Sequence, residues 1–235
     1  MAIEIQNLDL EEQEQLEQLK HLWNTWGNLI AGVLIVVLGA YAAWNGWQYW
    51  QRRQAAQASV LMSEVERAAT AGENTRLTQS LGDMQSRYGG TWYAAQASLL
   101  AAKTWADKDQ PEPAMQALNW ASEHASDDGL RAIARLRLAS LQIGAKAYDK
   151  AAQTLATSFP PAFQALAADR RGDLLMLQGK RTEAITEYGK AYQSMGPESG
   201  DYRRLIAIKL NALGIDPDVR AQPAAARPAA AGASS

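Results

Sequence analysis

The chain contains no cysteine among its 235 residues. Disulfide bonds, thiolate zinc sites, cysteine-ligated iron–sulfur clusters and a cysteine nucleophile are therefore excluded, although this absence does not fix the compartment. Only two histidines are present, His21 and His124, so an imidazole metal site or a Ser-His-Asp triad would have to be built around one of them. The formal net charge of −2 gives no global basic character of the kind that binds nucleic acid.

The sequence also lacks the short motifs that hold phosphates, dinucleotides or catalytic zinc. It has no P-loop, no glycine-rich dinucleotide turn and no HExxH pattern. The acidic pair Asp127-Asp128 stands at a turn, where capping of a helix N-terminus explains it better than acid–base catalysis. We therefore expect a protein that is not an enzyme, with no catalytic residue, no bound cofactor and no metal ligand.

The charges that are present divide the chain into four segments. Residues 1–27 carry six acidic residues against Lys20 alone, and residues 28–50 carry no charge. Residues 51–214 hold 20 basic and 17 acidic residues, a mixture typical of a solvated surface. Residues 215–235 are mostly Ala, Pro, Gly and Ser, which predicts a disordered tail.

The uncharged segment 28–50 predicts a transmembrane helix. Its strictly apolar centre, Leu29 to Ala43, is short, but with the flanking aromatic residues it reaches about 21 residues, or roughly 31 Å of helix, which matches the hydrocarbon thickness of a bilayer. Tryptophans flank the centre on both sides, where amphipathic rings favour the headgroup layers. We expect these residues at the membrane interfaces: Trp23, Trp26, Trp44, Trp47 and Trp50.

Two other interpretations of this segment compete with a membrane anchor. A buried core helix would also be apolar all round, but tryptophans at both ends favour lipid. A signal peptide cleaved after Ala42 would explain the small residues of Ala40-Tyr41-Ala42. The preceding region is acidic and 27 residues long, however, whereas signal peptides begin with a short basic region.

An amphipathic helix is predicted before the span. Asp9 and Glu12 form a capping-box pattern, and apolar residues recur after it at helical spacing up to Trp26. Such a helix would either lie on the membrane interface or offer a docking surface to a partner.

From residue 54 onward the pattern is helical, because β-branched residues are sparse and no stretch alternates with a period of two. Glycines and prolines separate segments of the length of short helices. The expected helix pairs span residues 54–71 with 74–88, 92–107 with 112–124, 130–143 with 147–157, and 162–178 with 181–194. A last helix at 200–213 would cover the apolar face that an open array exposes.

Two of these pairs are related by an internal repeat. Four residues of the third pair recur 33 positions later (172 − 139) in the fourth pair. The matched residues are Ala139 with Gly172, Lys146 with Gly179, Ala151 with Ala184, and Leu155 with Tyr188. Small residues let two helices approach closely, and large ones fill the space towards the next pair, as in a tetratricopeptide repeat. An alanine-rich bundle with chance matches is the alternative. The expected fold class is all-α, one N-terminal transmembrane helix followed by a tetratricopeptide-like α-solenoid.

In such an array the first helix of each pair lines the concave face. The repeat register places five residues towards that face: Gln96, Lys103, Ser140, Asp169 and Asp173. The charged run of residues 169–173 is explained either as a solvated helix face or as the polar rim of a peptide groove. Of Trp92, Trp105 and Trp120, we expect at least two to be core residues rather than binding platforms.

Three stretches carry a resemblance to a known family: Gly46-Trp-Gln-Tyr-Trp50, Leu136-Arg-Leu-Ala139, and Ala168-Asp-Arg-Arg-Gly-Asp-Leu-Leu-Met-Leu-Gln-Gly-Lys180. With the acidic N-terminus and the span, the chain resembles the ancillary SecYEG translocon subunit (YfgM-like) family of Gram-negative bacteria over about residues 10–214. The resemblance implies a bacterial inner-membrane protein whose array lies in the periplasm. It would lie beside the SecYEG channel and a membrane-anchored prolyl-isomerase-like chaperone, and assist client proteins that leave the channel.

The orientation implied by the resemblance is a cytoplasmic N-terminus and a periplasmic C-terminal domain. Positive charges near the span favour the opposite orientation, because Lys20 stands alone on one side and Arg52 and Arg53 on the other. Long domains translocate largely regardless of charge, so we follow the resemblance. A second functional hypothesis is a membrane-anchored scaffold for envelope assembly or cell division.

Overall fold

The computed structural model describes the backbone of residues 4–196 and 199–217, and the side chains of residues 26–29, 31–196 and 199–217. The described residues form nine α-helices and no strand, which confirms the all-α prediction. In chain order the helices are α1 (Glu4–Ala71), α2 (Asn74–Tyr88), α3 (Trp92–Ala106), α4 (Pro111–His124), α5 (Asp128–Gly144), α6 (Tyr148–Ala156), α7 (Pro161–Leu177), α8 (Arg181–Ser194) and α9 (Gly200–Ala212). The chain divides into two compact units, residues 1–53 and residues 54–235.

The first unit contains the apolar part of α1. Within the described residues, one helical stretch, in Trp26–Ala71, is long and apolar enough to cross a membrane, and little of its most apolar part is buried. A core helix would be mostly covered by protein, so this exposure argues against the buried-helix alternative. Four of the predicted interface residues are exposed: Trp26, Trp44, Trp47 and Trp50. The side chain of Trp23 lies outside the described residues.

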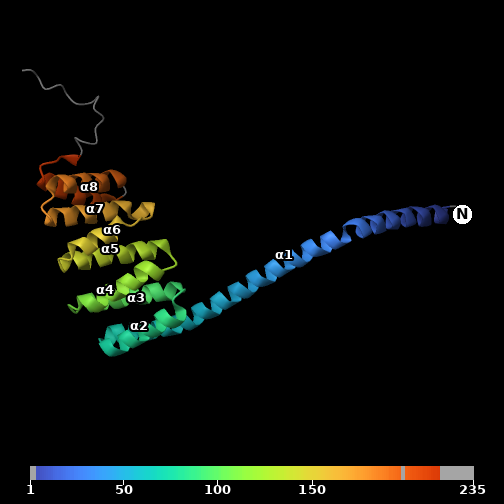
Figure 1. The fold of residues 1–235 in the computed structure, drawn as a ribbon, viewed down its shortest axis with the longest axis horizontal. Coiled ribbons are helices and arrows are strands. Elements are labelled where there is room, and N and C mark those ends of the chain that lie inside the picture. Colours follow the sequence, from blue (N-terminus) through green and yellow to red (C-terminus); the bar gives the residue numbers. More distant parts are fainter. Residues whose placement is uncertain (1–3, 197–198, 218–235) are drawn as a thin grey trace, which may run out of the picture. The chain divides into compact units, whose positions relative to one another are not determined.

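The second unit stacks its helices as antiparallel pairs in chain order, α3 with α4, α5 with α6, and α7 with α8 (Figure 1). The stretch Gln54–Ala71 of α1 begins this array together with α2, and its Ala58, Val65 and Ala68 are buried in the same cluster as Leu77 of α2. The helices α3, α5 and α7 pack on one another in turn. This arrangement confirms the predicted tetratricopeptide-like array.

A residue with positive φ follows each of the helices α1, α3, α5, α7 and α9. These residues recur at intervals of 33 to 37 along the chain: Gly72, Asp109, Lys146, Gly179 and Gly214. After each of them the next backbone N–H donates to the carbonyl five residues back, as from Lys180 to Leu175. This is the Schellman closure of a helix C-terminus, which requires a left-handed residue. Lys146 and Gly179, which match in the sequence repeat, therefore occupy the same left-handed position after their helices.

The core is rich in alanine and forms three hydrophobic clusters along the array. Trp105 is buried in the first cluster, and Trp120 is partly buried against it. Trp92 is 52% exposed and is not a core residue. Trp105 is therefore a core residue, Trp120 lies at the edge of the core, and Trp92 is on the surface.

Gly172 allows α7 and α8 to approach closely beside Tyr188 of α8. A Cβ atom at Gly172 would lie 2.5 Å from Cε1 of Tyr188. Gly172 therefore makes room for the aromatic ring one turn further along α8, while Ala184 is buried in the same cluster.

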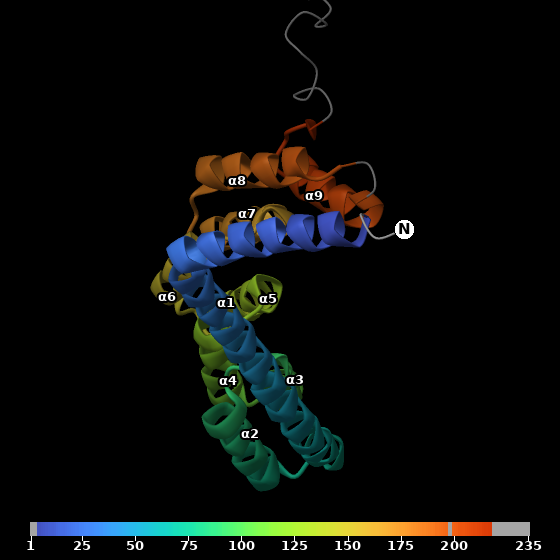
Figure 2. The same ribbon diagram turned by 90° about the vertical axis from the view of Figure 1, so that its right-hand side faces the viewer.

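The last helix, α9, covers the end of the array, where it packs against α8 and bonds to Asp169 of α7 (Figure 2). Its Ile206 and Leu210 are buried against Tyr188 and Tyr192 of α8. Ile215 packs against the same cluster, so the folded part includes the first residue assigned to the tail. Asp216 and Pro217 are also described, and the remaining residues of the predicted tail, 218–235, lie outside the described residues.

Candidate protein-binding groove

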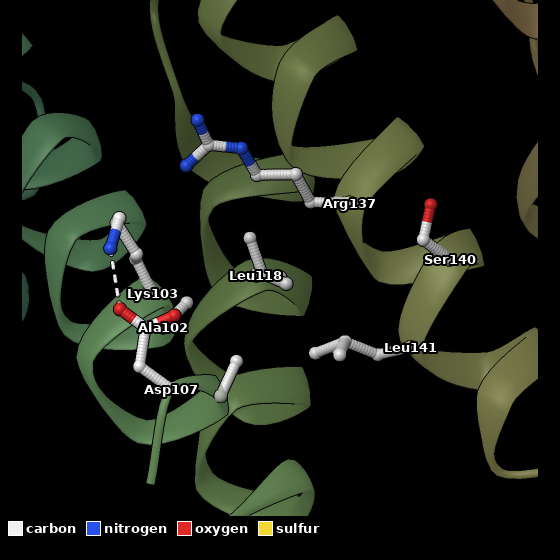
Figure 3. Close-up of a pocket in the computed structure, with 8 residues that line it drawn as sticks. Ala102, Lys103, Asp107, Leu118, Arg137, Ser140 and Leu141 are labelled. Carbon is white, nitrogen blue, oxygen red and sulfur yellow. Dashed lines mark hydrogen bonds and ion pairs between the residues drawn. The ribbon is translucent and has the colours of Figure 1, made fainter. Parts of the chain in front are cut away.

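A groove of about 310 Å³ lies between α3, α4 and α5 (Figure 3). Eight residues line it: Ala102, Lys103, Ala106 and Asp107 at the end of α3, Leu118 on α4, and Arg137, Ser140 and Leu141 on α5. The spacing of these residues on α3 and on α5 is that of one helix face. The groove therefore belongs to the surface formed by the first helices of two successive pairs.

The floor of the groove is apolar. Leu118 is almost fully buried, and Leu141 packs against the first core cluster. Ala102 and Ala106 have too little volume to fill the space between the helices, which leaves the groove open. Such a floor can take an aliphatic or aromatic side chain from a bound segment, because burying that side chain removes apolar surface from water.

The rim of the groove carries three charged residues. Lys103 and Asp107 form an i,i+4 ion pair whose side chains are 64% and 61% exposed. Arg137 is exposed and extends from α5 towards the side on which Lys103 lies (Figure 3). Two positive charges and one negative charge leave the rim with a formal charge of +1.

The structure brings together two of the five residues predicted on the concave face. Lys103 and Ser140 both line the groove. Gln96 lies seven residues before Lys103 on α3 and is not among the lining residues. That Gln96, Lys103 and Ser140 bind protein stays a prediction, whereas Asp169 and Asp173 contact α9.

Asp169 corrects the expectation of a solvated charged face. It is 1% exposed and accepts hydrogen bonds from Tyr202 Oη at 2.6 Å and Lys209 Nζ at 2.7 Å. Both donors belong to α9, which covers this side of α7. The sequence pattern of α7 alone predicts a surface position for Asp169, because it does not show that α9 packs there.

Asp173 belongs to the same polar cluster and is only partly exposed. Its Oδ1 accepts from Lys209 Nζ at 2.6 Å and from Tyr188 Oη at 2.8 Å. Burial, with the hydrogen bonds to Asp169 and Asp173, raises the pKa of both Tyr202 and Tyr188. Each hydroxyl therefore keeps its proton and donates to a carboxylate. This cluster joins α7, α8 and α9 and explains the charged run of residues 169–173 as structural.

A second ion-pair cluster joins α7 to α8 and to the end of α6. Arg171 Nε donates to Glu187 at 2.7 Å, and its Nη1 donates to the carbonyl of Leu155 at 3.1 Å. Burial opposes the ionisation of Glu187, but its hydrogen bonds to Lys190 and Arg171 and their charges outweigh it and lower its pKa. Arg171 is thus a packing residue between repeats.

Sequence reasoning missed four lining residues that give the groove its character: Asp107, Leu118, Arg137 and Leu141. Arg137 could have been predicted beside Ser140, because residues three apart in a helix lie on the same face. The part played by α4 had no sequence signal. Among the described residues, no group of three or more His, Asp or Glu side chains is placed to hold a metal ion.

Comparison with known proteins gives a consistent result. A family model described as a tetratricopeptide repeat-like domain matches residues 20–215. The chain is 32% identical over 156 residues to the ancillary SecYEG translocon subunit of Neisseria gonorrhoeae (strain ATCC 700825 / FA 1090), covering 66% of this chain and 74% of that protein. It is also 32% identical over 124 residues to the ancillary SecYEG translocon subunit of Escherichia coli (strain K12), covering 52% of this chain and 59% of that protein.

Proposed function

The chain belongs to the family of ancillary SecYEG translocon subunits, and we propose that it is a membrane-anchored adaptor of a Sec-type translocon. Its tetratricopeptide repeat-like domain supports this role. The observation that carries the proposal is the likeness over 74% of the Neisseria gonorrhoeae protein. The apolar stretch of α1 supports the proposal, because an adaptor that binds a channel in the bilayer has to reach the membrane itself.

The finer proposal assigns the two ends of the chain to two compartments of a bacterial envelope. The N-terminus lies in the cytoplasm, α1 crosses the inner membrane once, and the helical array lies in the periplasm. There the array belongs to a chaperone network with a membrane-anchored prolyl-isomerase-like chaperone, and it assists client proteins that leave the channel. The groove between α3 and α5 is the surface offered to those clients.

Site-specific photo-crosslinking in native membranes tests the adaptor role. A crosslinking residue replaces Val36, whose side chain is exposed on the apolar stretch, and a second variant carries it at Ser140 in the groove. We expect the Val36 variant to capture subunits of the SecY-type channel and the Ser140 variant to capture proteins in transit.

The matched control carries the same crosslinking residue at Lys150, which is exposed on α6 and does not line the groove. Efficient crosslinking at Val36 that recovers no channel subunit would contradict the proposal. Recovery of cell-wall or division proteins in place of channel subunits would support the scaffold hypothesis instead.

A further inference from the structure

Among the described residues, Arg137 is the groove cation that has no ion-pair partner. Lys103, on the opposite rim, is paired with Asp107. Within the described part of the chain, no hydrogen bond or ion pair is found for Arg137, although it lines the groove above an apolar floor (Figure 3). Other arginines of the same array are held by neighbours, as Arg131 is by Asp128 and Arg171 by Glu187.

An unpaired guanidinium at such a place favours a carboxylate. Its planar fork offers donors that match the two oxygens of a carboxylate, and paired charge-assisted bonds are stronger than neutral ones. The apolar floor lowers the local dielectric constant when a ligand covers it, which strengthens the attraction. The rim charge of +1 points to the same sign of ligand.

The dimensions and lining of the groove favour a polypeptide segment. A volume of about 310 Å³ accommodates one or two side chains, and Leu118 and Leu141 supply an apolar floor for them. A ligand with only an apolar side chain would leave the guanidinium of Arg137 without an ion-pair partner. A ligand with only a carboxylate would leave the apolar floor in contact with water.

We propose that the groove binds an extended polypeptide segment in which an aliphatic side chain adjoins an aspartate or glutamate, and that Arg137 selects this segment by pairing with its carboxylate. The proposal deepens the proposed function by naming the class of client segment that the adaptor holds. Asp107 opposes the same ligand, because its carboxylate lies on the rim and repels a second one. Asp107 therefore limits affinity, which favours release of the client.

Peptide binding to the full-length chain in nanodiscs of zwitterionic lipid tests this selectivity. The probes are two short fluorescent peptides, one alternating leucine with glutamate and one alternating leucine with glutamine. We expect the glutamate peptide to bind about tenfold more tightly, and the difference to shrink as salt is added. Arg137→Glu should abolish the preference, and Asp107→Asn should strengthen binding of the glutamate peptide by about twofold to fivefold.

The matched control is Lys150→Glu, which makes the same change of charge at an exposed position outside the groove. It should leave both affinities unchanged. Circular dichroism of each variant verifies that the helical array is intact. Equal binding of the two peptides, no binding of either, or equal effects of Arg137→Glu and Lys150→Glu would each overturn the proposal.

The peptide experiment and the crosslinking experiment test the two proposals independently. If channel subunits are captured but Arg137→Glu keeps the preference of the wild-type chain, the adaptor role stands and the selectivity of the groove is wrong. If no channel subunit is captured but the glutamate peptide binds through Arg137, the groove chemistry stands and the proposed place in the cell is wrong.

Discussion

Single residues in the turns of the array carry backbone conformations that only some side chains tolerate. Gly179 has φ of +75°, and a Cβ atom added there would meet nothing within 4 Å. The left-handed conformation alone therefore determines the cost of Gly179→Ala, which we expect to lower the free energy of unfolding by about 1 kcal/mol. Urea unfolding of the full-length chain in detergent, followed by circular dichroism, measures it.

Gly189 supplies the control for this experiment. It lies inside α8 with ordinary helical geometry, and a Cβ atom there would also meet nothing within 4 Å. Gly189→Ala should therefore raise the free energy of unfolding by about 0.5–1 kcal/mol, because alanine is the better helix former. A change of the same sign in both variants would show that the turn at Gly179 does not depend on its left-handed residue.

Gly172 tests close packing at the same scale. Because a Cβ atom would lie 2.5 Å from the ring of Tyr188, and that ring is held by the hydrogen bond from Tyr188 to Asp173, Gly172→Ala should overpack the α7–α8 pair. We expect a loss of about 1–3 kcal/mol in the free energy of unfolding. Gly189→Ala is the control. An unchanged thermal midpoint for Gly172→Ala would mean that α7 and α8 lie further apart than in this structure.

At the scale of the helices, the attachment of α9 depends on the buried polar cluster. Lys209→Met removes the ammonium group and leaves the carboxylate of Asp169, which is 1% exposed, with a hydrogen bond from Tyr202 but without its counter-ion. Loss of one partner of a buried ion pair costs about 3 kcal/mol or more. Hydrogen exchange of the α9 amides should accelerate, while exchange in α3 and α4 stays unchanged.

The double variant Asp169→Leu with Lys209→Met distinguishes pairing from packing. The double variant removes the carboxylate that is most deeply buried, and Asp173, which also loses Lys209, keeps its ion pair with Arg170. We therefore expect α9 to be protected better than in Lys209→Met alone. Lys150→Met, at an exposed position of α6, is the control for loss of a lysine and should leave the exchange of α9 unchanged. If the double variant exchanges faster than the single one, the ion pair itself holds α9.

At the scale of the whole molecule, the orientation in the membrane determines whether the array can meet proteins that leave the channel. We predict residues 1–27 in the cytoplasm and residues 51–235 in the periplasm, joined by an uncleaved span. Protease added to intact spheroplasts should then digest the array and leave a small membrane-embedded fragment from the N-terminus.

The same experiment separates the other outcomes. An array that stays protected until the cells are lysed is cytoplasmic, and the proposed role at the channel exit fails with it. Release of the whole array into the soluble periplasmic fraction would instead show cleavage after Ala42. Lys20, Arg52 and Arg53 favour the reverse orientation, so the result also measures how far translocation of a long domain overrides the charges beside a span.

The membrane-length apolar segment, the ends of the short helices and the repeat could be inferred from the sequence alone, whereas α1 begins at Glu4, before the capping-box pattern at Asp9. These features depend on local physics: an uncharged run matches the bilayer, glycine permits positive φ at Gly72, Gly179 and Gly214, and proline begins α4 and α7. Each is set by neighbours within a turn or two of the chain, so it can be inferred without knowing how the helices pack.

Which polar side chains are buried and which line a groove could not be inferred without the packing of the helices. Asp169 looked like part of a solvated helix face, yet Lys209, 40 positions further on, neutralises it inside the protein. Arg137 had no distinguishing pattern, yet it remains exposed above a floor that includes Leu118 from another helix. Burial and pairing depend on which helix covers a given face, and that depends on contacts between residues far apart in the sequence.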